Sequence, residues 1–383
     1  MIAARVHPFD LIARVLTERL RGFAASEELR CAVACPDVAW ERVLGRASTE
    51  YVLPAFAAAL HELDLTRPLD PELAAFLEAV HAASIERNGE LRDELAAAVG
   101  ALNRSGIEPV LLKGTIRLLD GLYPDDGWRM LRDLDLLVPH ARLADANRAL
   151  QDAGFAPCEV QGEFRRAGGI CQIDLHTELF ATPRQVRVLT AAEVLDRARP
   201  VAFGDGRVRI PSVEHQLIHL IGHSQIRHLG HAFGRIALRH RLEAAALVYW
   251  GHAGVDWQAV LARFSAAGYR RPLLSFLLAL RDGAWCAVPF TDDRDPLTAL
   301  HGRRIALQAR SRALAYLGSQ IGWWISTVRN QVAERDGSQR KAIRNFISLM
   351  SEPGGARRIA RAFLMRRRHL MHVLPYICWF MIQ

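Results

Sequence analysis

Apolar residues recur at intervals of three and four positions along the first 105 residues of the chain. The pattern is clear in FDLIARVLTERL and again in PELAAFLEAVHAASIERNGELRDELAAAVGALNRSG. Such spacing places the apolar side chains on one face of an α-helix. The turn residues in LTRPLDP and the glycine at 106 are expected to separate successive helices. Residues 1–105 are therefore predicted to form an N-terminal helical unit.

The pattern changes after Gly106, where short runs replace the long helical periods. IEPVLLKG is an apolar run bounded by proline and glycine, and DLDLLVP alternates charged and apolar residues, so both are predicted strands. EFRRAG and ICQIDLHTEL are predicted to form a hairpin that turns at Gly168–Gly169. Helices are predicted for TIRLLDGLY and RLADANRALQDAGF. Residues 106–205 are thus expected to form a small α/β core.

Helical spacing returns after Pro211. The main candidates are VEHQLIHLIGHSQIRHL, IALRHRLEAAALVYW, RPLLSFLLALRD and the stretches that begin near 303 and 338. We expect a C-terminal helical unit over 206–370 and an apolar tail over 371–383. The predicted fold class is α+β, with a small mixed-sheet core flanked by two helical units.

Composition agrees with a folded globular protein. The chain has 383 residues, of which 50% are hydrophobic and 23% charged, and this length suffices for two or three packed units. The six cysteines are scattered without a CxxC pair, and no basic segment followed by an apolar run marks a signal peptide. We therefore expect a cytoplasmic protein with reduced thiols. The apolar stretch after His372 is too short to span a membrane.

Charge is distributed unevenly along the chain. Residues 301–383 hold 15 Arg and Lys against 3 Asp and Glu, whereas the whole chain has a net charge of +8. This basic end is a candidate surface for RNA or a membrane, and the alternative is a solvated helical surface. The tail at 371–383 is interpreted as a docked terminal segment, with a weak contact to a membrane surface or a partner as the alternative.

Two acidic residues in the second predicted strand are the first candidates for catalysis. Side chains at positions i and i+2 of a strand point to the same face, so Asp133 and Asp135 project together. Two adjacent carboxylates repel each other unless a cation lies between them. Hard oxygen ligands at close range suit Mg²⁺ or Mn²⁺. A DxD strand with no metal, exposed to solvent, is the alternative.

A third acid comes from the predicted strand in ICQIDLHTEL. There Asp174 and His176 share a face. If this strand lies beside the first, Asp133, Asp135 and Asp174 converge. Three carboxylates can hold two metal ions, one that activates an acceptor hydroxyl and one that braces a triphosphate. His176 is expected to steer a carboxylate or phosphates, or to make one structural hydrogen bond.

The segment LLKGT supplies candidate phosphate ligands. Gly114 and Thr115 lie at a predicted strand-to-helix turn, where a glycine lets the backbone approach a phosphate. Lys113, one of only two lysines among 49 basic residues, adds a compact charge. Arg129 and Arg132 precede the acidic strand and are expected to reach the phosphates.

The order of these motifs resembles a known family. LLKGT, LYPDDGWRMLRDLDLLV, AGF and IDLHTEL occur in the order found in the uncharacterised nucleotidyltransferase family of bacteria, within the DNA polymerase β-like superfamily. The chain is more distantly similar to nucleotidyltransferase toxins. The resemblance is strongest over residues 85–180. It implies a nucleotidyltransferase core in the α/β region.

The resemblance also assigns residues. Gly114 and Thr115 take the place of the family's Gly-Ser element, although Gly114 lies 19 positions before Asp133, which is longer than the commonest spacing. Asp133 and Asp135 match the metal-binding pair. Asp174 matches the third acid, which helps to bind metal and is expected to take the proton of the attacking hydroxyl. Arg129 matches a family arginine, whereas Arg132 fills a position where a small polar residue is more usual.

A further set of histidines shares one predicted helical face. His215, His219 and His223 recur every four residues, without the glutamate of an HExxH zinc motif. They are interpreted as a half-buried packing face, and the alternative is a lining of the nucleotide or acceptor pocket.

Together these features predict a metal-dependent nucleotidyltransferase. It is expected to move an NMP from an NTP such as ATP to an acceptor hydroxyl or phosphate, with release of pyrophosphate and with Mg²⁺ or Mn²⁺ as cofactor. The acceptor stays open between tRNA or other RNA, a peptide or protein, and a small molecule. The alternative function is a degenerate module that binds RNA or a partner protein through its basic C-terminal helices. The presence of all three acids argues against that alternative.

Overall fold

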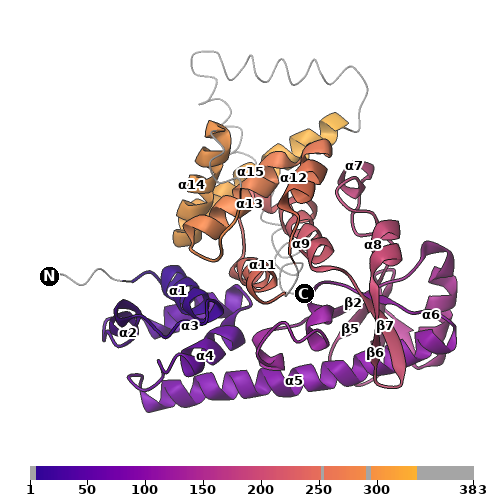
Figure 1. Cartoon of the computed structure of the whole chain (residues 1–383), viewed down its shortest axis with the longest axis horizontal. Coiled ribbons are helices and arrows are strands. Elements are labelled where there is room, and N and C mark those ends of the chain that lie inside the picture. Colours follow the sequence, from indigo (N-terminus) through magenta and orange to yellow (C-terminus); the bar gives the residue numbers. More distant parts are fainter. Residues whose placement is uncertain (1–5, 252–253, 290–294, 334–383) are drawn as a thin grey trace, which may run out of the picture. The chain divides into compact units, whose positions relative to one another are not determined.

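The computed structural model describes residues 6–251, 254–289 and 295–333, with side chains described up to 323 (Figure 1). The chain divides into two compact units, residues 1–322 and 323–383. The site and the cores described below belong to the first unit. The predicted stretch from 338, the end of the 206–370 unit and the apolar tail lie outside the described residues.

The chain begins with five helices, which confirms the predicted helical character of this region. They are α1 Pro8–Leu20, α2 Glu27–Val33, α3 Trp40–Thr49, α4 Leu53–Glu62 and α5 Pro71–Arg104. The long helix α5 starts where Asp70 accepts a hydrogen bond from the Glu72 amide and Pro71 occupies the first turn. Leu77 in its first half packs with the N-terminal helices, whereas Leu95 in its second half packs beneath the sheet. One helix therefore belongs to both cores.

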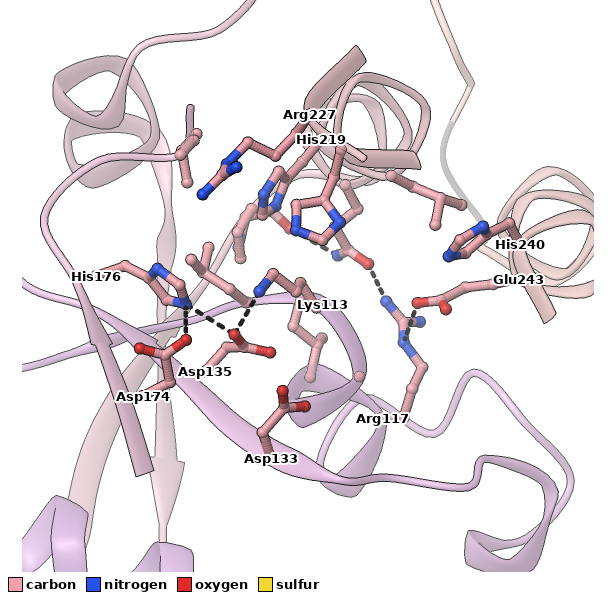
Figure 2. Close-up of a pocket in the computed structure, with 18 of the residues that line it drawn as sticks. Lys113, Arg117, Asp133, Asp135, Asp174, His176, His219, Arg227, His240 and Glu243 are labelled. Atoms are coloured by element: carbon pink, nitrogen blue, oxygen red, sulfur yellow. Dashed lines mark hydrogen bonds and ion pairs between the residues drawn. The ribbon is translucent and has the colours of Figure 1, made fainter. Parts of the chain in front are cut away.

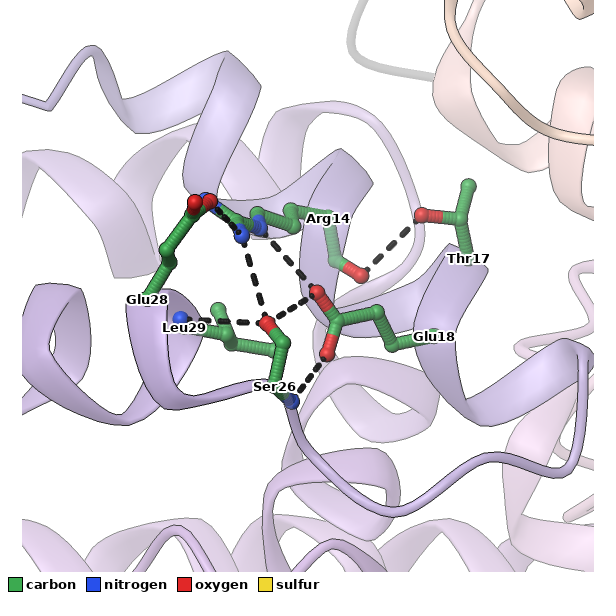
Figure 3. A network of polar contacts seen from close by, with 6 residues as sticks. All are labelled: Arg14, Thr17, Glu18, Ser26, Glu28 and Leu29. Atoms are coloured by element: carbon green, nitrogen blue, oxygen red, sulfur yellow. Dashed lines mark hydrogen bonds and ion pairs between the residues drawn. The ribbon is translucent and has the colours of Figure 1, made fainter.

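A polar network joins α1 to the start of α2 (Figure 3). The Ser26 hydroxyl accepts a hydrogen bond from the Leu29 amide at 3.2 Å and so caps α2. The amide and hydroxyl of Ser26 both donate to the Glu18 carboxylate, each at 2.8 Å. Arg14 completes the network through Glu18 at 3.0 Å and Glu28 at 2.7 Å. The cap is therefore tied to the preceding helix.

The sheet is mixed and has seven strands, in the order β3-β4-β5-β2-β1-β7-β6. The strands are β1 Val110–Leu111, β2 Asp133–Leu137, β3 Phe155–Pro157, β4 Glu163–Arg166, β5 Gln172–His176, β6 Arg199–Phe203 and β7 Gly206–Ile210. β2 runs parallel to its neighbour β5 and antiparallel to β1. Helix α6 (Leu143–Asp152) connects β2 to β3. With its flanking helices, the sheet confirms the predicted α+β fold.

The two faces of the central strands have opposite character. Leu134 and Leu136 of β2 and Ile173 of β5 are completely buried in a core shared with α5 and α6. Because side chains alternate along a strand, Asp133, Asp135, Asp174 and His176 point to the other face.

Two short helices that the sequence did not predict, α7 Pro183–Val186 and α8 Ala191–Arg197, lie between β5 and β6. Helices follow β7, as predicted. They are α9 Val213–Gly222, α10 Gly230–Phe233, α11 Leu238–Trp250, α12 Trp257–Ala266, α13 Arg270–Asp282, α14 Pro296–Arg310 and α15 Arg312–Ala333. Helix α9 continues directly into a π-helical turn at His223–Arg227. Among the described residues, no helix has both the length and the apolar character needed to cross a membrane.

Most predicted elements of the core are confirmed, but three further details differ. The stretch after β1 forms a short 3₁₀ helix at Lys113–Leu118 and not the predicted helix over TIRLLDGLY. The hairpin of β6 and β7 was not predicted, and neither was the short strand β3. The division into units at 105, 205 and 370 stays a prediction.

Candidate active site

The register between β2 and β5 brings the acidic residues of the two strands together. In this parallel pair Asp135 lies opposite Asp174, and Asp133 lies opposite Gln172. The two strands are therefore neighbours, as the convergence of the acids requires. Figure 2 shows the carboxylates of Asp133, Asp135 and Asp174 along one side of a pocket.

Asp135 is the most enclosed of the three acids, with 1% of its surface exposed. Its Oδ1 lies 2.5 Å from Lys113 Nζ and 2.7 Å from His176 Nε2. Burial alone would raise the pKa of this carboxyl, but Lys113 and His176 hold it well below its usual value. Asp135 is thus a carboxylate compensated by two cationic partners.

His176 connects the two opposed acids. The same Nε2 lies 3.0 Å from Asp174 Oδ2. Burial lowers the pKa of this imidazole, but the hydrogen bonds to Asp135 and Asp174 outweigh it and raise the pKa to about 9. At neutral pH His176 is therefore an imidazolium that donates to both carboxylates.

The donor set fits a divalent cation. Ligand atoms of Asp135, Asp174 and His176 all lie within 4.8 Å of one another. Carboxylate oxygens suit Mg²⁺ or Mn²⁺, whereas imidazole nitrogen suits softer metals. The two aspartates are consequently the better candidates for ligands, and the charged His176 is suited to orienting them.

Asp133 occupies a different position from the other two acids. It begins β2 and is exposed as a residue, although it lines the same cavity. Desolvation at the cavity wall and the neighbouring Asp135 charge raise the pKa of Asp133. The compact cluster in the described residues is Asp135, Asp174 and His176, and Asp133 lies at its edge.

The turn after β1 carries the predicted phosphate ligands Lys113, Gly114 and Thr115, and each of them contacts a different group of the protein. Lys113 adopts a left-handed backbone conformation, with φ of 50°, which is uncommon outside glycine. Its ammonium is directed at Asp135 (Figure 2). A Cβ atom at Gly114 would lie 2.3 Å from Leu131 Cδ2, so a side chain at this position would have to displace Leu131.

Thr115 was predicted beside Gly114 at the phosphates, but its side chain is fully buried. Its hydroxyl accepts a hydrogen bond from the Asp135 amide at 2.8 Å. Thr115 does not line the cavity and instead fixes the backbone of β2.

Arg129 and Arg132 both line the cavity, and their predicted contact with phosphates stays a prediction. Arg129 Nε lies 3.2 Å from Glu243 Oε2, and Arg132 donates to the Tyr51 hydroxyl at 3.1 Å. Glu243 of α11 is buried and also contacts Arg117 at 3.7 Å. No local pattern in the sequence marks Arg117, Tyr51 or Glu243 as residues of the site.

The cavity has a volume of about 450 Å³ and extends from the sheet to the helices that follow it. His215, His219 and His223 all line it, which agrees with the alternative interpretation of their shared helical face. His215 and His219 are also buried, and His215 lies 3.5 Å from Glu193. Burial, helped by the Lys113 charge, lowers the pKa of His219 to about 3.

A further group of residues that no sequence pattern predicted also lines the cavity. They are Arg117, Arg227, His228, Arg239, His240 and Glu243. Figure 2 shows Arg227 and His219 across the pocket from Asp174, and His240 beside Glu243. Residues of α9, the π-helical turn and α11 form one side of the cavity, here called the helical wall. The histidine spacing indicates this wall, but no pattern in the sequence identifies its arginines.

Comparison with known proteins gave one finding. The model of a family described as uncharacterised nucleotidyltransferase matches residues 36–282, more than half of the chain. Neither the curated proteins nor the solved structures include a significant match. The matched region contains the sheet, the three acids and the helical wall of the cavity.

Proposed function

The chain belongs to the uncharacterised nucleotidyltransferase family, and from this premise we propose that it moves an NMP from an NTP to an acceptor with release of pyrophosphate. The pairing of β2 with β5 carries the proposal, because it sets Asp135 directly opposite Asp174 at the floor of a cavity. Paired carboxylates beside cationic groups are the arrangement that phosphoryl transfer uses.

In the proposed reaction, the acceptor oxygen attacks the α-phosphorus of the NTP. A new oxygen–phosphorus bond forms, and the bond between the α-phosphorus and the bridging oxygen breaks. Pyrophosphate leaves with the electron pair of that bond. Asp174 takes the proton of an acceptor hydroxyl, because it is the less enclosed of the two opposed acids and lines the cavity.

The other residues position this centre. Lys113 and His176 neutralise Asp135 and fix its orientation by hydrogen bonds. Thr115 holds the Asp135 backbone from the opposite side. Asp133, Asp135 and Asp174 are the proposed ligands of Mg²⁺ or Mn²⁺, which when bound would stabilise the charge of the phosphates.

The experiment that tests this function is a transfer assay with purified protein. Each α-³²P-labelled NTP is incubated in turn with Mg²⁺ or Mn²⁺ and one of three acceptor pools: total RNA, protein extract, or small metabolites. We expect label to appear in one pool with one preferred NTP, and the acceptor is then identified from that pool.

The matched pair of variants is Asp135→Asn and Asp152→Asn. Asp152 is an exposed aspartate that ends α6. We expect Asp135→Asn to abolish labelling and Asp152→Asn to leave it unchanged. Labelling that persists in full in Asp135→Asn would contradict the assignment, as would the lack of any labelled product with every NTP and pool.

A further inference from the structure

The arginines that line the cavity differ in how their charges are balanced. Arg117 pairs with Asp120 at 2.7 Å, and both Arg117 and Arg129 contact the buried Glu243. Arg227 and Arg239 have no such partner: within the described part of the chain, no carboxylate lies at ion-pair distance from either. These two cations come from the helical wall, which faces the carboxylates across the cavity.

Arg239 is held in place by contacts other than an ion pair. Its guanidinium lies 4.8 Å from the centre of the Tyr51 ring, and its Nε donates to His240 Nε2 at 3.3 Å. Burial and the neighbouring Arg129 lower the pKa of Arg239 to about 10, so the group is still charged at neutral pH. A partly buried cation with no carboxylate at ion-pair distance in the described residues is costly, and an anionic ligand would compensate that cost.

Arg227 is presented by an unusual stretch of backbone. It ends the π-helical turn at His223–Arg227, and Leu229 follows in a left-handed conformation with φ of 57°. A Cβ atom at Gly230 would lie 2.4 Å from the Ser224 carbonyl oxygen, so only glycine allows the backbone to pass this close to the π-helical turn. π-Helical turns and left-handed residues other than glycine concentrate at functional sites.

Two histidines in and just after the π-helical turn lie beside each other in the cavity lining. His223 and His228 lie with their Nε2 atoms 3.2 Å apart. Burial and the Lys113 charge lower the pKa of both, so they are neutral hydrogen-bonding groups at neutral pH. His223 and His228 line the same cavity as Lys113, Arg227 and Arg239. Cationic and hydrogen-bonding groups therefore continue from the carboxylate end of the cavity to Arg227 and Arg239.

We propose that Arg227 and Arg239, assisted by the imidazoles of His223 and His228, bind the β- and γ-phosphates of the NTP and then the pyrophosphate product. This inference rests on the proposed nucleotidyl transfer, because it assigns one part of the substrate to one wall of the same cavity. The α-phosphate end faces the carboxylates, and the rest of the triphosphate extends past Lys113 to the helical wall. One guanidinium group can donate two parallel hydrogen bonds to the oxygens of a phosphate, which suits this role.

Two observations favour this wall over the turn after β1. Thr115 has its hydroxyl bonded to the Asp135 amide, and Lys113 has its ammonium bonded to the Asp135 carboxylate. The groups that the sequence assigned to the phosphates are thus already engaged. Arg227 and Arg239 are charged, line the cavity and lack an acidic partner in the described residues.

The test measures binding directly and needs neither an acceptor nor turnover. Calorimetry with inorganic tripolyphosphate, pyrophosphate and AMP is compared for the wild-type protein, Arg227→Gln, Arg239→Gln and Arg67→Gln. Arg67 is the control, because its side chain is 82% exposed and pairs with Asp64. We expect each cavity variant to bind tripolyphosphate and pyrophosphate about tenfold or more weakly, with AMP affinity unchanged.

Arg227 is exposed, so Arg227→Gln keeps the test valid even if Arg239→Gln fails to fold. Unchanged tripolyphosphate affinity in Arg227→Gln overturns the proposal, and so does an equal loss for AMP. The proposed transfer is judged separately from labelled product in the wild-type protein. If no labelled product forms, a measured loss of tripolyphosphate affinity still supports the phosphate-binding role of the arginines. If Arg227→Gln binds tripolyphosphate normally, the proposed transfer reaction is unaffected.

Discussion

Lys113 and Asp135 form an enclosed ion pair, with the ammonium nitrogen 2.5 Å from the carboxylate oxygen. Lys113 precedes Asp135 by 22 residues and holds a left-handed backbone conformation while making this contact. The pair explains why a chain so rich in arginine keeps a lysine here. A compact ammonium fits beside a carboxylate that already accepts a hydrogen bond from His176, whereas a planar guanidinium would need more room.

The first prediction separates Asp135 from Asp133. Repulsion between the two acids, taken alone, predicts that replacing either one by asparagine stabilises the metal-free protein. The environments of the two residues differ, however. The pKa of Asp135 is depressed by Lys113 and His176, whereas the pKa of Asp133 is raised. We therefore expect Asp135→Asn to destabilise the protein by about 2–4 kcal/mol, because it leaves enclosed cations without their partner.

Asp133→Asn should instead hold or raise the stability of the metal-free protein at neutral pH. Its ionised form is disfavoured in the folded state, so removing the charge relieves that cost. Thermal unfolding in EDTA at pH 7 measures both effects. Equal shifts in the same direction for the two variants would contradict this account.

The strands of the core could be predicted because their signals are local. Asp133 and Asp135 alternate with Leu134 and Leu136, and a period of two is the property of a strand that a sequence shows directly. The hairpin of β4 and β5 is also local, since it turns at adjacent glycines. The alternation in ICQIDLHTEL therefore predicts the correct face for Asp174.

The helical wall could not be predicted in the same way. Arg227 and Arg239 reach the cavity only because α9 and α11 fold back against the start of the core, about 100 residues away in sequence. No local spacing marks an arginine that lacks a carboxylate partner. The β6–β7 hairpin is different, because Gly204 and Gly206 flank Asp205 and are a local turn signal between the two strands.

The second prediction concerns the hydroxyl of Thr115. It accepts a hydrogen bond from the Asp135 amide in a fully buried position. Thr115→Val should destabilise the protein by about 1–3 kcal/mol, because a buried N–H loses its acceptor. If nucleotidyl transfer is the reaction, kcat should fall more than KM rises, since the change displaces Asp135 without removing a phosphate ligand.

Thr115→Ser is the matched control, because it keeps the hydroxyl and removes only a methyl group. We expect it to restore most of kcat and most of the hydrogen-bond contribution to stability. A Thr115→Val protein with unchanged stability and unchanged kcat would show that this hydrogen bond does not position Asp135.

The third prediction tests why residue 114 is glycine. An added Cβ would press against Leu131, so Gly114→Ala should cost about 1–3 kcal/mol of stability through overpacking. Leu131→Ala alone also destabilises, because it opens a cavity. The double variant should be more stable than the sum of the two losses predicts, since the new methyl group occupies the space that Leu131 vacates. Denaturant unfolding of all four proteins gives this coupling.

NTP affinity in the same four proteins shows whether Gly114 also meets the phosphates. If packing with Leu131 is the whole reason for the glycine, the double variant recovers NTP affinity together with stability. If the double variant recovers stability but not NTP affinity, Gly114 has the phosphate-binding role that the sequence predicts.

The last prediction concerns the Ser26–Glu18 network, which lies in the helical N-terminal region and tests the fold independently of the active site. Ser26→Ala should lower stability by about 1 kcal/mol at pH 7, because Leu29 loses its capping acceptor and Glu18 loses a hydroxyl donor.

The same network predicts a dependence on pH. Burial raises the pKa of Glu18, but the hydrogen bonds from Ser26 and Arg14 outweigh it and lower the pKa below 4.5. The unfolded chain therefore binds the proton more readily, so this contribution is complete above pH 4.5 and is lost as pH falls through the folded-state pKa. The stability difference between wild type and Glu18→Gln should shrink as pH is lowered from 6 to about 3. Glu28→Gln is the control, because that side chain is 84% exposed and its ion pair with Arg14 is worth little. A difference for Glu18→Gln that stays constant over this range would mean that the Glu18 charge does not stabilise the helix start.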